Sequence, residues 1–146
     1  MNYSQARDAL ADLFDAAMDH LPTQIERRRS GEAVLISSDD LRDVLERYEF
    51  TPQVYFEAGA VSVWLPELAV WGRGSDLAGA RADLLAEVRE YIEDFATDEV
   101  LRRAPNHRER AAWVLRARLL TDEDLDAALF DDPTQPEADA TAAARR

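Results

Sequence analysis

The chain has 146 residues, of which 47% are hydrophobic, and its formal net charge is −13. It is long enough to bury a core, and the absence of cysteine excludes disulfides, thiolate metal sites and cysteine nucleophiles. The acidity opposes indiscriminate binding to nucleic acid and favours a basic protein partner, so any DNA contact must be local and basic.

The first third of the chain predicts a helix, two short strands and a second helix. Ser4 can cap the first helix and Pro22 ends it. Its apolar positions fall on one stripe at helical spacing: Ala6, Leu10, Leu13, Phe14, Ala17 and Leu21. The stretches TQIERR and AVLIS predict a hairpin around Gly31, and Ser37 with Asp40 forms a plausible capping box for the next helix.

The middle of the chain predicts a small β-β-(β)-α unit over residues 50–96. QVYFEA and AVSVWLP alternate around Gly59, which indicates a second hairpin with Val61, Val63 and Leu65 on one side. LAVWGRG can add an edge strand before a long helix capped by Ser75 or Asp76. The apolar seam of that helix is Leu77, Leu84, Val88, Ile92 and Phe95. We interpret Trp64 and Trp71 as core or hairpin packing.

From residue 97 onward the pattern is purely helical. The stretches DEVLRRA, HRERAAWVLRARLL and TDEDLDAALF each predict a helix, and Thr121 can cap the last one. Residues 131–146 contain two prolines and no apolar periodicity, so we expect a disordered tail.

Three consecutive arginines, Arg27 to Arg29, precede the turn of the first hairpin in this acidic chain. Successive strand residues point to opposite faces, but an adjacent turn can bring two guanidinium groups to one surface. The simplest interpretation is a solvated turn that balances Glu26 and Glu32. The alternative is a local basic patch.

The sequence offers little for catalysis. His20 and His107 belong to no metal or triad spacing, and GRGSDLAG lacks the lysine of a P-loop. The acidic residues of the second helix could hold Mg²⁺, but a solvated helix face explains them equally well; they are Asp39, Asp40, Asp43 and Glu46. We therefore expect no enzymatic activity, no cofactor and no metal.

The order of these features resembles the Phd/YefM group of bacterial antitoxins. The matching elements are Ser4 with Arg7, Ile25 with Arg27, the Gly31 turn, the apolar run 33–36, Ser37, and the acidic-capped helix 39–48. The resemblance implies a dimerising module that grips operator DNA, with Ser4, Arg7 and Arg27 at the contact. Gly31 comes one residue later than that pattern expects, so Arg28 or Arg29 could hold the role of Arg27.

The middle unit is similar to HicB-type antitoxins, in which a strand ends in proline and a glycine turn precedes an Ala/Leu-rich helix. The matching positions are Pro66, Glu67, Leu68, Gly72 or Gly74, and Ala80. A generic ββα fold is the alternative.

In Phd/YefM antitoxins the C-terminal segment wraps the toxin, and the resemblance implies that role for the closing helices here. Their apolar residues would anchor the toxin: Trp113, Val114, Leu119, Leu125, Leu129 and Phe130. The alternative is that these side chains fold back on the core of the chain itself.

We therefore predict an α+β protein with a Phd/YefM-like α-β-β-α module in residues 1–49, the ββα unit in 50–96, a helical toxin-binding extension in 97–130 and a disordered tail in 131–146. It would be a dimeric antitoxin that binds a cognate toxin and represses its own operon through operator DNA. The rival interpretations are a stand-alone DNA-binding regulator and a toxin-neutralising protein with no role on DNA. With neither a signal peptide nor a membrane-spanning apolar run, we expect it in the cytoplasm.

Overall fold

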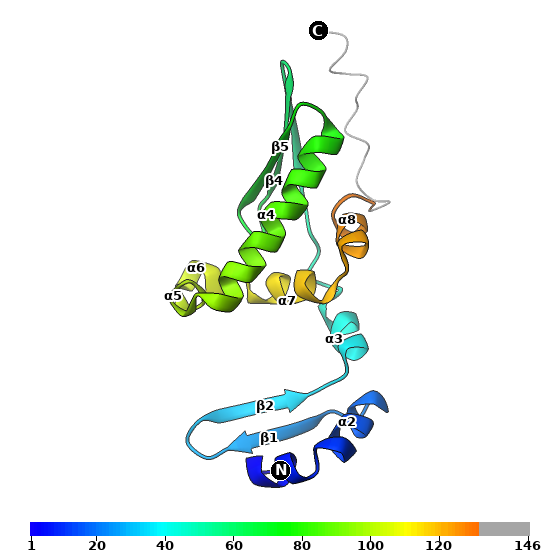
Figure 1. The fold of residues 1–146 in the computed structure, drawn as a ribbon, viewed down its shortest axis with the longest axis vertical. Helices are drawn as coiled ribbons and strands as arrows, with labels where there is room; N and C mark the ends of the chain where they lie inside the picture. Colours follow the sequence, from blue (N-terminus) through cyan, green and yellow to red (C-terminus); the bar gives the residue numbers. More distant parts are fainter. Residues whose placement is uncertain (132–146) are drawn as a thin grey trace. The chain divides into compact units, whose positions relative to one another are not determined.

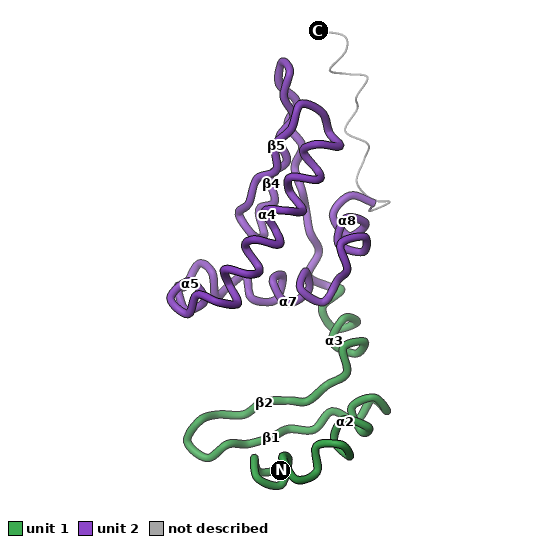
Figure 2. The backbone as a smooth tube through the Cα atoms, in the orientation of Figure 1, with its two compact units in different colours: residues 1–46 green, residues 47–146 purple. Residues whose placement is uncertain are grey.

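The computed structural model describes residues 1–131 and forms two compact units, residues 1–46 and residues 47 onward (Figure 2). Both units combine helices with an antiparallel sheet, which confirms the predicted α+β class (Figure 1). Within the described residues, no helix combines the length and the apolar character needed to cross a bilayer.

Unit 1 contains three helices and one hairpin. In chain order its elements are α1 (Tyr3–Asp8), α2 (Leu10–Met18), β1 (Thr23–Arg27), β2 (Gly31–Leu35) and α3 (Ser38–Leu45). The predicted single first helix is therefore divided in two, because Ala9 leaves the helical conformation with φ −111° and ψ 23°.

The predicted cap at Ser4 is wrong. Helix α1 begins at Tyr3, two residues earlier than a cap at Ser4 implies, and Asn2 caps it by accepting a hydrogen bond from the Gln5 backbone N–H at 2.9 Å. The Gln5 side chain in turn accepts from the Asn2 N–H, which completes a reciprocal capping box. Ser4 therefore lies inside the first turn of α1.

The first hairpin forms where the sequence predicts it. Strands β1 and β2 pair antiparallel, with Arg27 opposite Gly31 at the turn. Arg29 and Gly31 both have positive φ, 66° and 110°, which is the backbone conformation that makes a glycine useful here. The N-terminus adds a short parallel bridge, since the Glu26 N–H donates to the Met1 carbonyl at 2.9 Å.

Unit 2 is built on a three-stranded antiparallel sheet with the order β3-β4-β5. The strands and the long helix are β3 (Gln53–Glu57), β4 (Ala60–Leu65), β5 (Val70–Gly74) and α4 (Leu77–Thr97). Val61, Val63 and Leu65 are buried on one side of β4, as predicted, and α4 packs against β4 and β5. Gly72 permits this contact, because a Cβ there would lie 2.4 Å from the Ala80 carbonyl oxygen.

The closing helices belong to the same unit. They are α5 (Glu99–Arg103), α6 (Pro105–Arg108), α7 (Ala111–Leu119) and α8 (Asp122–Phe130). Val114 and Ala117 of α7, with Leu125 and Leu129 of α8, are buried in one core with β4 and α4. The extension predicted for residues 97–130 is thus not a separate module, because its apolar side chains complete the core under α4. The predicted tail, apart from Asp131, lies outside the described residues.

Candidate nucleic-acid and partner-binding surfaces

The predicted DNA-contacting arginines of the hairpin are exposed at its turn. Arg27 ends β1 and lies over the Tyr3 ring, with its Cζ 5.3 Å from the ring centroid. Arg28 and Arg29 occupy the turn itself, which the Ser30 N–H closes by donating to the Arg27 carbonyl at 2.9 Å. The chain therefore presents three consecutive exposed arginines, one at the end of β1 and two in the turn, and guanidinium groups are suited to phosphate contacts.

Arg7 is the other arginine that the Phd/YefM resemblance places at the DNA contact. It lies in the last turn of α1, so the favourable field of a helix N-terminus does not act at this position. Its guanidinium contacts the neighbouring Asp8 carboxylate at 3.1 Å, and both side chains are 70% exposed. An exposed pair of this kind contributes little to stability, so exchange of Asp8 for another anion would cost little.

Unit 1 also carries an apolar surface. Helix α2 buries Leu13 and Ala17 but exposes Leu10, Phe14 and Met18, which follow one another at intervals of four residues. Leu10 is 60% exposed and Phe14 58%. A groove of about 220 Å³ adjoins this stripe and is lined by Phe14, Ala17, Met18, Leu35, Ile36, Ser37, Ser38 and Asp39. The groove extends the apolar stripe toward the start of α3.

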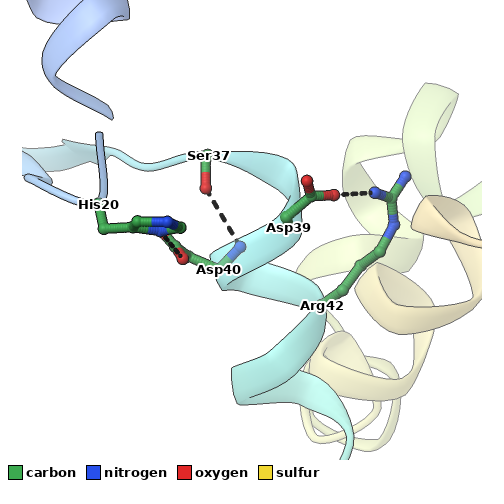
Figure 3. A network of polar contacts seen from close by, with 5 residues as sticks. All are labelled: His20, Ser37, Asp39, Asp40 and Arg42. Carbon is green, nitrogen blue, oxygen red and sulfur yellow. Dashed lines mark hydrogen bonds and ion pairs between the residues drawn. The ribbon is translucent and has the colours of Figure 1, made fainter. Parts of the chain in front are cut away.

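A polar network fixes the N-terminus of α3 within unit 1 (Figure 3). The Ser37 hydroxyl caps the helix, as predicted, by accepting from the Asp40 N–H at 3.1 Å. His20, which has a φ of 62°, places its Nδ1 2.6 Å from Asp40 Oδ1. Figure 3 shows the imidazole and the carboxylate facing each other, while Arg42 donates to Asp39 at 2.7 Å.

The contact between His20 and Asp40 shifts both titrations. The hydrogen bond to Asp40, followed by the charge of Asp40, raises the pKa of His20 above its ordinary value of 6.5. The same hydrogen bond, and then the one from Ser37, lowers the pKa of Asp40 below 3.8. His20 thus joins the turn after α2 to α3 most strongly when it is protonated. It was predicted from the sequence only as a residue without a catalytic partner.

Five of the six residues predicted to anchor a toxin pack into or against the core of unit 2. Val114, Leu125 and Leu129 are buried, and Trp113 and Phe130 are partly buried against the same core. Leu119 is half-buried. In this conformation the side chains stabilise the unit itself, which corresponds to the alternative of packing on the chain's own core.

Arginines hold α7 and α8 in place. Arg89 of α4 donates to the carbonyls of Ala117 and Leu120, both at 2.9 Å, and to Asp122 at 2.7 Å. Arg81 donates to Asp126 at 2.7 Å, and its guanidinium lies 4.4 Å from the centroid of the Phe130 ring. The Ala117 carbonyl also accepts from the Leu120 N–H at 3.4 Å, so Arg89 adds a second donor there, and it supplies a donor to the Leu120 carbonyl just after the end of α7.

The sheet of unit 2 has a second face, opposite α4, that sequence reasoning treated as simple packing. Trp64 and Trp71 are cross-strand partners whose ring centroids are 4.8 Å apart, and Tyr55 lies 5.8 Å from Trp71. Trp64 is half-buried, whereas Trp71 and Tyr55 are exposed. The strand alternation carried this signal, because Tyr55, Trp64 and Trp71 all fall opposite the buried positions.

The described part of the chain shows no metal centre, since no three His, Asp or Glu side chains in it are arranged to hold an ion. Two of the acidic residues of α3 have other partners: Asp40 contacts His20, and Asp39 pairs with Arg42. His107 makes a 2.7 Å contact with the Tyr91 hydroxyl, which joins α6 to α4.

Comparisons with known proteins agree on one class. A PHD-like family model, described as antitoxin of toxin–antitoxin systems, RelE / RelB, matches residues 1–129. Among solved structures, the chain is similar to an antitoxin part of a proposed toxin/antitoxin system from Syntrophomonas wolfei subsp. wolfei. The two share 17% identity with a TM-score of 0.78, over 89% of this chain and 95% of the other, so this likeness shows the fold. No curated protein matches the chain.

Proposed function

The chain belongs to a family of antitoxins of RelE/RelB toxin–antitoxin systems, and from that premise we propose that it binds and neutralises a cognate toxin and represses its own operon through operator DNA. The observation that carries the proposal is the family match, which spans both units. As an antitoxin it would act by stoichiometric binding in the cytoplasm and not as an enzyme.

We assign DNA binding to unit 1, in the manner of Phd/YefM antitoxins. Residues 1–46 contain five arginines and ten carboxylates, so the unit as a whole is acidic. Three of the five arginines are nevertheless consecutive and exposed at the hairpin turn. A basic turn on an acidic body supports local phosphate contacts without general attraction to nucleic acid.

We also propose that unit 1 is the dimerisation module. A 46-residue unit has a small core, here with Ala6, Leu13 and Ala17 among its buried residues. Units of this size usually need oligomerisation or another staple to be stable. The exposed stripe of Leu10, Phe14 and Met18 is the apolar surface that a second copy would cover. Two copies would place two basic turns on the two halves of an operator.

The DNA role is tested by replacing Arg27, Arg28 and Arg29 together with Gln. The affinity for a fragment of the chain's own promoter should fall at low salt, and the slope of log affinity against log salt should decrease by about 0.9 for each phosphate that the variant no longer neutralises. Arg118, exposed on α7, provides the matched control as Arg118→Gln. Equal affinities for the triple variant and the wild type would remove the hairpin from the DNA interface.

The toxin role is tested with the product of the adjacent gene. That product should arrest growth when expressed alone, and co-expression with this chain should restore growth and yield a stable complex. A harmless neighbour that does not bind would instead leave a stand-alone DNA-binding regulator as the function. Rescue of growth by a chain that has lost operator binding would show that neutralisation and repression are separate activities.

A further inference from the structure

The open face of the unit 2 sheet carries a continuous aromatic surface. Cross-strand pairing places Gln53, Trp64 and Trp71 in one row across the three strands, with Tyr55, Ser62 and Arg73 in the next. Trp71 is 40% exposed and Tyr55 45%. Because paired residues of antiparallel strands point to the same side, these side chains form one surface on the side away from α4. We call Tyr55, Trp64, Trp71 and Arg73 the aromatic face.

The core of unit 2 is complete without this face. Val61, Val63 and Leu65 on the other side of β4 are buried beneath the helices, together with Leu84 and Val88 of α4. The Trp71 ring contacts both the Trp64 and the Tyr55 ring in tilted arrangements, and the Arg73 Cζ lies 6.0 Å from the Trp71 centroid. These contacts stabilise the sheet, yet they leave the Trp71 and Tyr55 rings exposed to water. Tryptophan, tyrosine and arginine are also the residues most enriched at the energetic centres of protein interfaces.

The edge of the aromatic face is acidic. A hollow of about 360 Å³ opens beside β5, and carboxylates of α4 form one wall of it. Its lining residues are Ala69, Val70, Trp71, Arg73, Asp83 and Glu87. Glu57 is exposed at the end of β3, on the same side of the sheet as Tyr55. The hollow itself has two carboxylates against one arginine, a balance that favours a cationic ligand over a phosphate chain.

We propose that the aromatic face docks the toxin, with a basic segment of the toxin lying over Trp71 and Tyr55 and its cations directed to Asp83 and Glu87. The inference rests on the proposed function and assigns to it a binding surface. Apolar contact and cation–π attraction to the rings would supply the affinity. The acidic rim would select a basic partner and speed the encounter. The toxin would thus bind a rigid, preformed sheet.

The experiment measures the dissociation constant of the full chain for the purified product of the adjacent gene. One variant removes the rings, Tyr55→Ala combined with Trp71→Ala. The second, Glu87→Arg, reverses one exposed charge on α4, so it tests the surface even if the first variant folds poorly. Val100→Ala, at a position 82% exposed on α5, and Glu109→Arg, also exposed, are the matched controls. Thermal unfolding of each free variant reports whether it folds.

Each test variant should raise the dissociation constant by at least about tenfold, while the controls stay within about twofold of the wild type. Wild-type affinity in both test variants would overturn the inference and leave the antitoxin function intact. The inference would also be overturned if the test variants lost self-association, or lost binding to a single-stranded RNA, while their affinity for the toxin stayed at the wild-type value. If the wild-type chain does not bind the product of the adjacent gene, the proposed antitoxin function fails. The assignment of the toxin to the aromatic face then fails with it.

Discussion

At the scale of single residues, the contact between His20 and Asp40 makes unit 1 sensitive to pH. The pKa of His20 is raised, so its contribution to stability is complete below 6.5 and disappears as the pH rises through the folded-state value. The pKa of Asp40 is lowered, so its contribution is present above 3.8 and disappears as the pH falls through its folded-state value. Together they stabilise unit 1 most between these two titrations.

We therefore expect an NMR titration of the imidazole to place the pKa of His20 above 6.5 in the wild-type chain. In Asp40→Asn the pKa should return toward 6.5, because the first two causes of the shift are the hydrogen bond and the charge of Asp40. Asp39→Asn, which removes a more distant charge, is the control and should change the value only slightly. A wild-type pKa at or below 6.5 would show that the pair does not form in solution.

At the scale of elements, Arg89 connects three segments through one guanidinium group. Its Nη atoms donate to the last carbonyls of α7, and its Nε donates to the first residue of α8. The bond to Asp122 adds little, because that side chain is 81% exposed. The two carbonyl bonds carry the effect, since their loss removes the side-chain donor at the end of α7 and leaves the Ala117 carbonyl with only the 3.4 Å bond from the Leu120 N–H.

Arg89→Ala should lower the free energy of unfolding of unit 2 by about 2 kcal/mol, the value typical of hydrogen bonds from a charged group. Arg89→Lys should restore less than half of that loss, because an ammonium group cannot reach two carbonyls as a fork. Urea unfolding followed by tryptophan fluorescence measures unit 2 selectively, since Trp64, Trp71 and Trp113 all belong to it. Arg103→Ala, which breaks an exposed pair with Glu99, should change the free energy by less than about 0.5 kcal/mol.

The burial of α8 leads to a second prediction about an element. Leu125 is fully buried in the core of unit 2, so Leu125→Ala should cost about 2 to 5 kcal/mol in the same unfolding measurement. Leu115→Ala on α7, where the side chain is 38% exposed, should cost less than about 1 kcal/mol. If Leu125→Ala proved neutral for stability but weakened toxin binding, α8 would act as an anchor for the partner and not as part of the core.

Local patterns in the sequence predict some of these elements and are silent about others. Strand β4 was predictable because burial alternates along Val61, Val63 and Leu65, and the caps at Ser37 and Thr121 were predictable because they are local signals. The break at Ala9 has no such signal, since neither glycine nor proline marks it. Whether α7 and α8 bind a partner or pack on their own unit was not predictable, because an apolar helix face has the same pattern in both cases. The aromatic face was missed for a related reason: alternation reveals a side chain's face but not whether that face is covered.

At the scale of the whole molecule, dimerisation and operator binding should depend on each other. Phe14→Glu places a charge in the exposed stripe of α2, so the chain should sediment as a monomer and its operator affinity should fall about tenfold or more. Asp12→Asn, on the opposite side of the same helix, is the control and should leave both properties unchanged. Analytical ultracentrifugation and a gel shift measure the two effects. A dimeric Phe14→Glu variant would place the interface between copies elsewhere.

The outer edge of β5 has a consequence for the colloidal behaviour of the chain. The Asp83 carboxylate accepts a hydrogen bond from the Arg73 backbone N–H at 2.8 Å, on the side of β5 that faces no other strand of the sheet. An unoccupied edge of this kind recruits strands from neighbouring molecules and promotes aggregation. Asp83 occupies this N–H and adds a negative charge beside it, which are two features that oppose strand pairing between copies of a chain. The same carboxylate that would attract a toxin would thereby also disfavour edge-to-edge association of the antitoxin.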